Sequence, residues 1–515
     1  MIKRLLILLI LLIAVPCYGA TIYIDPTASG NNDGTTPTHA FESWTGVTGG
    51  AGFVRNNTYV QKCGTTYPGT LSIATAASGT DKIIISAYNA DGTSEIGKEV
   101  FGANCSGGLA KPIIDDDDTG GAVSIGADYI ELNSIHVKDG DSSIYVNGGN
   151  NIIKYCEVSG GRGGIRSGLS SSTNVLYIGY NYLHTDWGHD EILDDLDGIQ
   201  IAGYTDNATI EYNVIDGYAH SAVGVSNTNS SGIEVRYNSM YSWDDAMDQC
   251  MTANGTNSTF HHNYCTDCGV IQMYNASGNS VYSNVIDGIS TNSYIQGGSQ
   301  IALQPLLAGD NVIDNKIYNN TIYDRRDSGW NPVCITLYGW SAVAGVIERN
   351  EIYNNICLNF DSTSVVFYVL DPNDKVESNP ADPDVNIWRN NLAYGWTAAN
   401  VAYIEGDYYV DITDKGSTYF NNYGAAYNNL DSDPGLEDPA NSEFWPSSSA
   451  SAVYQAGYNV GAPYDTLLLS TSDFTASPPL VNTDQFANDY IGAYGLVGAT
   501  KSYPFQGAAG NFKLN

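Results

Sequence analysis

One short pattern recurs along most of this chain: a β-forming stretch that carries an asparagine, two or three further apolar residues, and a polar or glycine-containing turn. Examples are ATIEYNVIDG, GIEVRYNSMYSW, NSVYSNVIDG and VIERNEIYNN. The equivalent asparagines are Asn181, Asn213, Asn238, Asn263, Asn284, Asn320, Asn350 and Asn390, at steps of 32, 25, 25, 21, 36, 30 and 40 residues, and Asn133 and Cys156 extend the register upstream. Repetition of this kind is typical of a solenoid, in which each repeat buries its apolar face against its neighbours.

Steps of 21 to 25 residues fit one coil of a three-sided parallel solenoid, and the longer steps contain loop insertions such as WGHDEILDDL. Asparagine suits the corner because it tolerates the left-handed backbone conformation and can hydrogen-bond to the same amide in the next coil. Leucine-rich repeats would require leucine at these positions, and propeller blades a longer period. We therefore predict an all-β fold, a right-handed parallel β-helix of about ten coils with an N-terminal cap and a C-terminal tail.

The first 20 residues, MIKRLLILLILLIAVPCYGA, place Lys3 and Arg4 before an apolar run that ends in small residues. This pattern predicts a signal peptide. The run is shorter than a membrane-spanning helix, so we expect a secreted protein, extracellular or at the cell surface, without membrane insertion. The remaining chain divides into a cap with first coils (21–114), the β-helix (115–400), and C-terminal coils with a capping tail (401–515).

Eight cysteines remain when Cys17 is set aside, an even number that suits an oxidising compartment. Their positions make three disulfides plausible, and the third leaves two partners open. The candidates are Cys63 with Cys105, Cys334 with Cys357, and Cys250 with either Cys265 or Cys268.

The formal net charge of −35 limits the partners that the chain can bind. Such a charge repels phosphate backbones and anionic membranes, so we expect no nucleic acid partner. A polyanionic glycan would also be repelled unless cations bridge it. The charge therefore favours a neutral polysaccharide, or an acidic one bridged by calcium.

Three segments resemble secreted right-handed parallel β-helix proteins of the pectate-lyase-like superfamily. They are the opening TIYIDPTASGNNDGTTPTHAFESW, the stretch YVQKCGTTYPGTLSIATAASGTDKIIISAYNADG that continues to KPIID, and the tail NLDSDPGLEDPANSEFWPSSSASAVYQAG with DYIGAYG, in which Ser451-Ala452-Val453 replaces the usual Ser-Pro-Ala. Members of this superfamily are mostly polysaccharide lyases, glycoside hydrolases and glycan-binding proteins, so the resemblance implies an extracellular polysaccharide as the partner. It does not identify the reaction, because one fold hosts many chemistries.

Equivalent positions in successive coils form rows on the surface of a solenoid. We align GGIRSG, DGIQIAG, SAVGVSN and DAMDQCM, with Ile165, Ile199, Val223 and Met247 pointing inward. The predicted outward row is then Arg166, Gln200, Gly224 and Asp248, and a second line runs from Asp197 through Ser221 to Asp245, beside His220.

Two carboxylates on alternate coils would lie about 10 Å apart, close to the separation that inverting glycoside hydrolases need. We therefore predict that Asp197 is catalytic together with Asp245 or Asp248, and that His220 holds the attacking water, orients a carboxylate or binds a sugar hydroxyl. Arg166, Gln200, Trp187 and Trp243 are candidate substrate-binding residues, the tryptophans because they can stack on sugar rings.

The stretch HDEILDDLDGIQIAG is an acidic insertion that ends in a strand. It is similar to the acidic pairs of polygalacturonase-like hydrolases, but the Asp-Asp pair here precedes the strand, His220 has Ala219 and Ser221 as neighbours instead of glycines, and no Arg-Ile-Lys follows. Its carboxylates Asp190, Glu191, Asp194 and Asp195 form a candidate calcium site.

Two other readings stay open. A lyase would use calcium or Arg166 to neutralise a uronate and a basic side chain to abstract a proton, although no lysine occurs between Asn181 and Gly309. A surface or adhesion rod would bind glycan through exposed aromatic residues without cleaving it. Asp197-Gly198 and Asp216-Gly217 also have a purely structural interpretation, since Asp-Gly pairs form turns.

Overall fold

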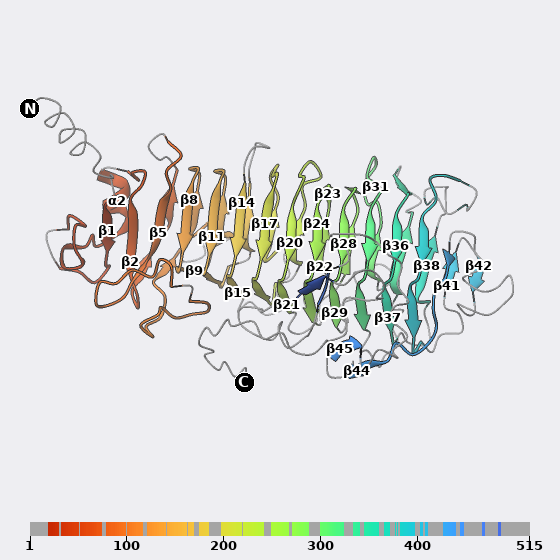
Figure 1. Ribbon diagram of the computed structural model, residues 1–515. Coiled ribbons are helices and arrows are strands. Elements are labelled where there is room, and N and C mark those ends of the chain that lie inside the picture. Colours follow the sequence, from red (N-terminus) through yellow and green to blue (C-terminus); the bar gives the residue numbers. More distant parts are fainter. Residues whose placement is uncertain are drawn as a thin grey trace, which may run out of the picture.

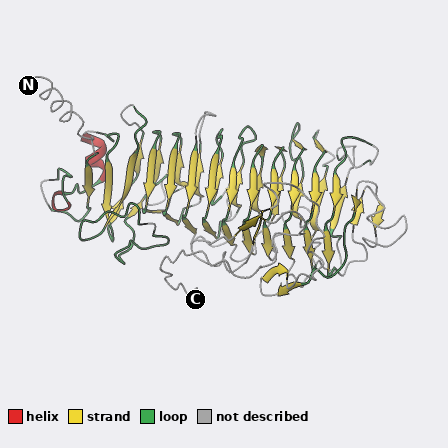
Figure 2. Cartoon of the chain, viewed as in Figure 1, coloured by secondary structure: helices red, strands yellow, loops and turns green. Residues whose placement is uncertain are grey.

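The computed structural model shows an elongated stack of short strands that runs the length of the molecule (Figure 1). The structure describes residues 19–29, 32–50, 52–74, 79–98, 100–116, 121–140, 142–161, 163–168, 175–184, 197–218, 220–241, 249–266, 270–287, 299–323, 333–339, 345–359, 365–370, 376, 379, 382–396, 402–404, 407–409, 426–438, 443–446, 466–468 and 483–485. Among them the regular secondary structure is nearly all strand, joined by loops and turns, and helix is confined to the 3-10 turn η1 (Pro37–His39) and to α2 (Trp44–Gly50) near the N-terminus (Figure 2).

Three long sheets account for most of the described strands. The 14-strand sheet consists of β1 (Thr21–Ile24), β2 (Thr58–Lys62), β5 (Ile83–Tyr88), β8 (Ile130–Asn133), β11 (Asn151–Lys154), β14 (Leu176–Gly179), β17 (Ala208–Glu211), β20 (Glu234–Arg236), β24 (Thr259–His261), β28 (Ser280–Tyr282), β32 (Lys316–Tyr318), β36 (Glu351–Tyr353), β39 (Ile387–Arg389) and β43 (Ala426–Tyr427).

The 12-strand sheet consists of β3 (Thr66–Pro68), β6 (Ile113–Asp115), β9 (His136–Lys138), β12 (Glu157–Ser159), β15 (Tyr182–His184), β18 (Val214–Asp216), β21 (Ser239–Tyr241), β25 (Tyr264–Thr266), β29 (Val285–Asp287), β33 (Thr321–Tyr323), β37 (Ile356–Leu358) and β40 (Leu392–Tyr394). The 13-strand sheet consists of β4 (Leu71–Ile73), β7 (Val123–Ile125), β10 (Ser142–Val146), β13 (Gly163–Ser167), β16 (Ile199–Ile201), β19 (Ser221–Val225), β22 (Gln249–Ala253), β26 (Val270–Met273), β30 (Ser299–Leu303), β34 (Val333–Tyr338), β38 (Phe367–Leu370), β41 (Ala402–Ile404) and β42 (Asp407–Tyr409).

Smaller elements complete the described strands. A four-strand sheet contains β23 (Gly255–Thr256), β27 (Ala276–Ser277), β31 (Asn311–Ile313) and β35 (Val346–Glu348). Two antiparallel pairs lie nearer the C-terminus, β44 (Leu436–Asp438) with β45 (Glu443–Pro446) and β46 (Thr466–Leu468) with β47 (Thr483–Gln485).

Each coil adds one strand to each long sheet in turn, as β11, β12 and β13 do, and every pairing in these sheets is parallel except the terminal β41–β42. Connections between parallel strands of one sheet are right-handed as a rule. The predicted three-sided parallel β-helix is therefore confirmed. The strand counts show that coils also precede Asn133 and follow Asn390.

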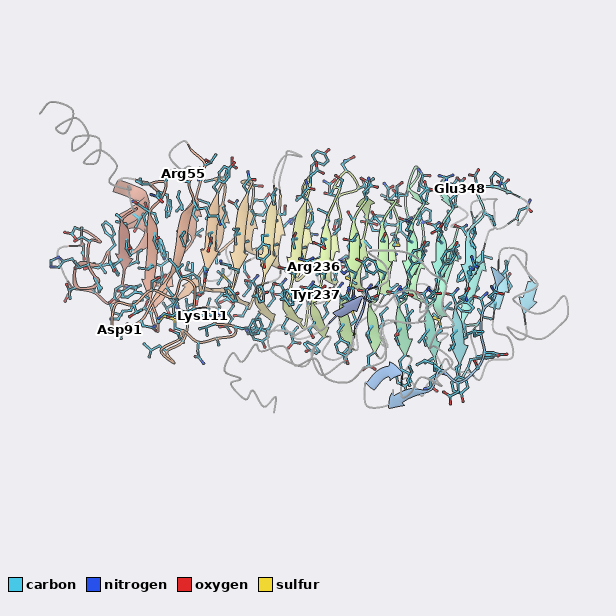
Figure 3. The ribbon with its side chains drawn as sticks, in the orientation of Figure 1. Arg55, Asp91, Lys111, Arg236, Tyr237 and Glu348 are labelled. Carbon is cyan, nitrogen blue, oxygen red and sulfur yellow. A yellow bond between two sulfur atoms is a disulfide. The ribbon has the colours of Figure 1, made fainter. Side chains whose placement is uncertain are left out.

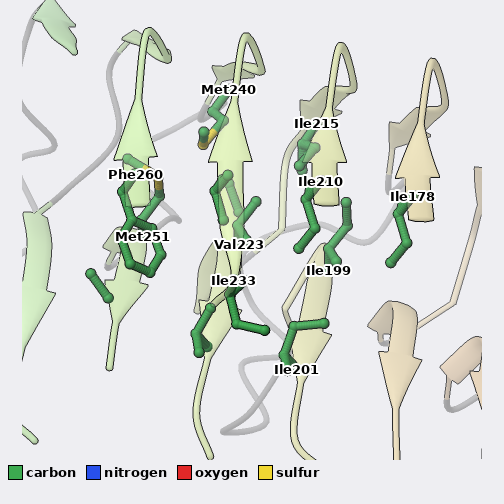
Figure 4. Packing of buried hydrophobic residues seen from close by; sticks show 14 of the residues in the cluster. Ile178, Ile199, Ile201, Ile210, Ile215, Val223, Ile233, Met240, Met251 and Phe260 are labelled. Carbon is green, nitrogen blue, oxygen red and sulfur yellow. The ribbon is translucent and has the colours of Figure 1, made fainter. Parts of the chain in front are cut away.

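The core is a continuous column of buried aliphatic side chains, one layer from each coil. Ile199, Val223 and Met251 point inward from consecutive strands of the 13-strand sheet, and Ile215 and Met240 do so from the 12-strand sheet (Figure 4). Because a layer contacts only the layers above and below it, burial is built up by nearest-neighbour packing.

An asparagine ladder closes the corner between the 14-strand and 12-strand sheets. Each side-chain amide donates to the amide oxygen of the next member at 2.9–3.0 Å, and the members are Asn181, Asn213, Asn238, Asn263, Asn284, Asn320, Asn355, Asn391 and Asn429. The first six predicted members are confirmed. All nine ladder asparagines are fully or almost fully buried, so the ladder satisfies backbone groups that water cannot reach.

The predicted register was wrong at both ends of the ladder. Asn350 belongs to a second ladder, in which Asn279, Asn315, Asn350 and Asn386 hydrogen-bond in series at another corner. Asn390 precedes the true member Asn391, and Asn133 lies two residues before Ile135, which occupies the equivalent position. Cys156 does occupy a ladder position, since its backbone N–H donates to Asn181.

The left-handed residue of this corner is the one that precedes each ladder asparagine, and the asparagine itself has a negative φ. This position holds Tyr155, Tyr180, Tyr212, Tyr237 and His262, all with φ between 54° and 59°. The four tyrosine rings stack at 4.8–5.1 Å, and the Arg236 guanidinium lies 5.5 Å from the centroid of the last ring (Figure 3). Ring stacking between coils offsets the strain of a left-handed tyrosine.

Three disulfides link six of the seven described cysteines, and all three were among the candidates: Cys63–Cys105, Cys250–Cys265 and Cys334–Cys357. Cys156 is buried and unpaired. No helix within the described ranges is both long and apolar enough to cross a membrane.

Candidate active site

The outer face of the 13-strand sheet carries the row that includes Arg166 and Gln200. Strand pairing places Arg166 opposite Gln200, and Gln200 opposite Gly224, as predicted. The next position is Thr252, followed by Gln272. Thr252 therefore occupies the row position at which Asp248 was predicted. Met251 is the inward residue opposite Val223, where Met247 was predicted.

The second line needs the same correction. Asp197 lies opposite Ser221, and Ser221 pairs with Gln249, where Asp245 was expected. The cause is a slip of four residues: Met247 and Met251 are both apolar, and a slip by an even number preserves the alternation of inward and outward side chains. The pattern alone could not decide which methionine enters the core.

Asp197 and His220 form the central pair of this surface. Oδ1 of Asp197 lies 2.8 Å from Nδ1 of His220, and the Asp197 side chain is 1% exposed while that of His220 is 34% exposed. Oδ2 of Asp197 finds no hydrogen-bond partner among the described residues. A buried carboxylate thus supports an imidazole that reaches the surface.

Gly224 makes this arrangement possible. A methyl group on its α-carbon would collide with Oδ2 of Asp197, so the carboxylate occupies the space that a side chain at position 224 would fill. The glycine has no left-handed backbone to explain its presence. Because Gly224 has no side chain, the Asp197 carboxylate has the space it needs to contact Nδ1 of His220.

Ser221 also contacts this imidazole, but not in the geometry of a catalytic triad. Its Oγ lies 3.3 Å from Nδ1 of His220, the same nitrogen that Asp197 contacts. A nucleophilic serine must instead meet the opposite ring nitrogen. The pair of Asp197 and His220 is therefore suited to acid–base chemistry, and Ser221 to supporting it.

An ionised Asp197 can only accept a hydrogen bond, so Nδ1 of His220 carries a proton. In the neutral ring the lone pair then lies on Nε2. A histidine held in this way is suited to general acid–base chemistry through Nε2.

Several predicted site residues lie outside the described residues. They are Trp187, Asp190, Glu191, Asp194 and Asp195 in the stretch 185–196, and Trp243, Asp245 and Asp248 in the stretch 242–248. The described ranges contain no group of three or more histidine, cysteine, aspartate or glutamate side chains arranged to hold a metal. The predicted calcium site therefore stays a prediction.

A second polar cluster, which the sequence reasoning missed, lies on the outer face of the 12-strand sheet. Glu157 contacts His136 at 3.4 Å and His184 at 3.1 Å, so one carboxylate joins two imidazoles from the coils on either side of it. Burial raises the pKa of Glu157, but the hydrogen bond from His184 and the charge of His136 hold it below its usual value. Burial lowers the pKa of His136, against the attraction of Glu157.

Asp216 follows His184 in the same row of this sheet. It is 8% exposed, and burial raises its pKa to about 6 although the charge of His184 acts in the opposite direction. Aligning the strands HVK, EVS, YLH and VID, which directly follow the ladder corner, would have brought these groups together.

A scan against models of protein families gave no match, and a search of curated protein sequences gave none either.

Solved structures with similar folds include three carbohydrate-active enzymes. A mannuronic-acid-specific family 6 polysaccharide lyase from human gut microbiota has 12% sequence identity and a TM-score of 0.44, and the match covers 82% of this chain and 93% of that one. A pectate lyase has 13% identity, a TM-score of 0.41, and coverage of 71% and 80%. A lacto-N-biosidase of family GH136 from Eubacterium ramulus has 10% identity, a TM-score of 0.42, and coverage of 75% and 67%. These likenesses concern the fold alone, and the parallel β-helix that they share with this chain is established by its own strand pairing.

Proposed function

We propose that this chain is an extracellular enzyme that cleaves a polysaccharide on the outer face of the 13-strand sheet. His220 transfers the proton and Asp197 orients its ring. The observation that carries this proposal is the buried Asp197 carboxylate held against the partly exposed His220 in the space left by Gly224. Burying a carboxylate with an unpartnered oxygen costs stability, and such arrangements are concentrated at functional sites.

Hydrolysis is the first form of the reaction. Nε2 of His220 would remove a proton from the water that attacks the anomeric carbon, while the leaving oxygen takes a proton from an acid. The strand register gives no support to the carboxylate pair expected for an inverting hydrolase, because Gln249 and Thr252 stand where Asp245 and Asp248 were expected. Asp197 accordingly acts through His220 and not as one of two equivalent carboxylates.

Elimination is the second form, and Arg166 favours it. This exposed guanidinium lies on the same row, two strands before Gly224, which corresponds to about 10 Å. It would neutralise a uronate carboxylate while His220 removes the proton from the adjacent carbon. The electron pair then forms a carbon–carbon double bond as the glycosidic oxygen leaves and is protonated.

Incubation with neutral and uronate polysaccharides tests the proposal. New reducing ends report either reaction, whereas ultraviolet absorbance of an unsaturated product reports elimination only. We expect His220→Gln to lower kcat/KM by about 10² to 10⁴-fold, since that is the usual contribution of a general acid or base. Gly224→Ala should cost about 10²-fold because it displaces Asp197.

His39→Gln is the matched control, since His39 lies in η1 near the N-terminus and not on this face. Unchanged kcat/KM in folded His220→Gln would refute the assignment of the site. If the protein binds a glycan but releases no product from any polysaccharide, the proposed cleavage is wrong and the protein is a glycan-binding protein.

A further inference from the structure

A line of hydrogen-bonding side chains continues from His220 across the next two coils. Oγ of Ser221 lies 3.3 Å from Oε1 of Gln249 and 3.3 Å from Oγ1 of Thr252. Thr252 also donates to Oε1 of Gln249, and Nε2 of Gln249 donates to Oε1 of Gln272 at 2.7 Å. Ser221, Thr252 and Gln272 are between 0% and 9% exposed, so protein groups dominate their hydrogen bonding.

The hydrogen bond from Gln249 to Gln272 determines which group of the Gln249 amide faces the two hydroxyls. Because Gln272 takes the amide N–H of Gln249, the amide oxygen of Gln249 faces the two hydroxyl groups. An amide oxygen only accepts, and each hydroxyl has one hydrogen. With Nδ1–H of His220 donated to Asp197, the Ser221 hydrogen points to Gln249 or to Thr252, and Ser221 turns a lone pair toward His220.

Nδ1 of His220 is consequently in contact with two acceptors, the Asp197 carboxylate and the Ser221 oxygen. Both stabilise a proton on Nδ1 and leave the lone pair on Nε2. If Ser221 were free to rotate, its hydrogen could point at Nδ1. That arrangement would favour the opposite tautomer and compete with Asp197.

The backbone of β22 is adapted to this role. The pairing of β22 with β26 shifts register between Gln249 and Met251, which leaves Cys250 as the additional residue of a bulge. Cys250 is tied to Cys265 by a disulfide inside the solenoid. Bulges of this kind redirect a neighbouring side chain, and here the neighbour is Gln249, whose amide reaches Gln272.

We propose that Gln249, held by Gln272, is a positioning residue that fixes the tautomer of His220 from the adjacent coil. The catalytic consequence rests on the proposed function, since it requires Nε2 of His220 to be the base. The tautomer itself does not depend on that function. Loss of the Gln249 acceptor releases the Ser221 hydroxyl and mixes the two neutral forms of the ring.

Nitrogen-15 NMR of histidine-labelled protein tests this inference without substrate. The chain has seven histidines, and the spectrum of His220→Gln identifies the signals of His220 by their absence. We expect the native protein to show His220 with its proton on Nδ1. Gln249→Met should mix the tautomers, whereas Gln249→Glu keeps an acceptor oxygen toward Ser221 and should restore the native signals. Gln272→Leu, which lets the Gln249 amide rotate, should act like Gln249→Met.

Kinetics provide the second readout. We expect Gln249→Met to lower kcat by about 10-fold with little change in KM and to shift the acidic limb of the pH profile, on which protonation inactivates the base, with recovery in Gln249→Glu. Native tautomer signals in folded Gln249→Met would overturn the inference. If the tautomer changes as expected but no polysaccharide is cleaved by the native protein, the proposed function fails and the positioning role of Gln249 stands.

Discussion

Asp216 at the end of β18 is a buried carboxyl group without a full set of hydrogen bonds. Its Oδ1 finds no partner among the described residues, and burial raises its pKa to about 6 against the opposing charge of His184. The folded protein therefore binds this proton more tightly than the unfolded chain, in which the aspartate pKa is about 3.9. Stability contributed by the protonated form is complete below about pH 4 and is lost as the pH rises through about 6.

We expect Asp216→Asn to raise the free energy of unfolding by about 1–3 kcal/mol at pH 7.5, because it removes a charge that the fold does not stabilise. The gain should shrink below pH 6 and vanish near pH 4. Urea unfolding at several pH values measures the difference. The exposed Asp81→Asn is the control, and a gain of equal size at pH 4 and pH 7.5 would show that charge is not its cause.

Asp197, His220 and Ser221 show how much of the candidate site sequence can predict. DGIQI and SAVGV each contain one strand with a single workable register, so their adjacency could be read from alternation. The position of Gln249 could not be predicted in this way. The segment MDQCM admits two registers, with either Met247 or Met251 pointing inward, and they differ by an even number of residues. The function of Gly224 was also hidden, since only coordinates show which carboxylate fills its side-chain space.

At the scale of the element, the asparagine ladder is the strongest determinant of the corner that it closes. Asn238 illustrates its local role: its amide donates to Ile210, Arg236 and Asn263, and its oxygen accepts from the backbone and side chain of Asn213. Removing such a side chain leaves buried backbone groups without partners.

We expect Asn238→Ala to lower the free energy of unfolding by about 3–5 kcal/mol, in the range reserved for broken buried networks. Asn238→Asp keeps the acceptor but loses the three donated hydrogen bonds and buries a charge against acceptor oxygens, so it should cost at least as much. Denaturant unfolding measures both changes. Asn311→Ala, which removes an exposed hydrogen bond to Gly309, should cost less than about 1 kcal/mol, and an equal loss in both alanine variants would contradict a special role for the ladder.

The asparagines of the ladder also explain where the predicted register of the coils was correct and where it was wrong. Single asparagines such as Asn213 and Asn238 left one choice of register. In later coils the pairs Asn354-Asn355 and Asn390-Asn391 offer two adjacent asparagines, one for the left-handed corner and one for the ladder. The second asparagine ladder runs through the same coils and adds further asparagines that could be mistaken for members of the first ladder. The type of fold could therefore be predicted from the sequence, while the register of the asparagines in these coils could not.

For the whole molecule, the lengths of the connections separate a structural corner from a functional one. The ladder corner needs two residues, as between β14 and β15. Between the 12-strand and 13-strand sheets the chain runs from His184 to Ile199, from Tyr241 to Gln249, and from Asp287 to Ser299 before the next strand begins. Long connections thus precede β16, which follows Asp197, and β22, which begins at Gln249, whereas the connection that contains His220 is short, from Asp216 to Ser221. Variable connections on a rigid scaffold are where binding and catalysis concentrate.

The net charge of −35 acts on the whole molecule and bears on the class of glycan that reaches this surface. Raising the ionic strength from about 0.01 M to 0.15 M shortens the screening length from about 30 Å to about 8 Å. We expect KM for a polyanionic glycan to fall as salt is added, because repulsion is screened, and KM for a neutral glycan to stay constant. Initial rates at fixed pH over a sodium chloride series measure both. A polyanionic substrate whose KM rises with salt would contradict repulsion by the whole molecule and would locate attraction at Arg166, with Arg166→Gln removing the salt dependence.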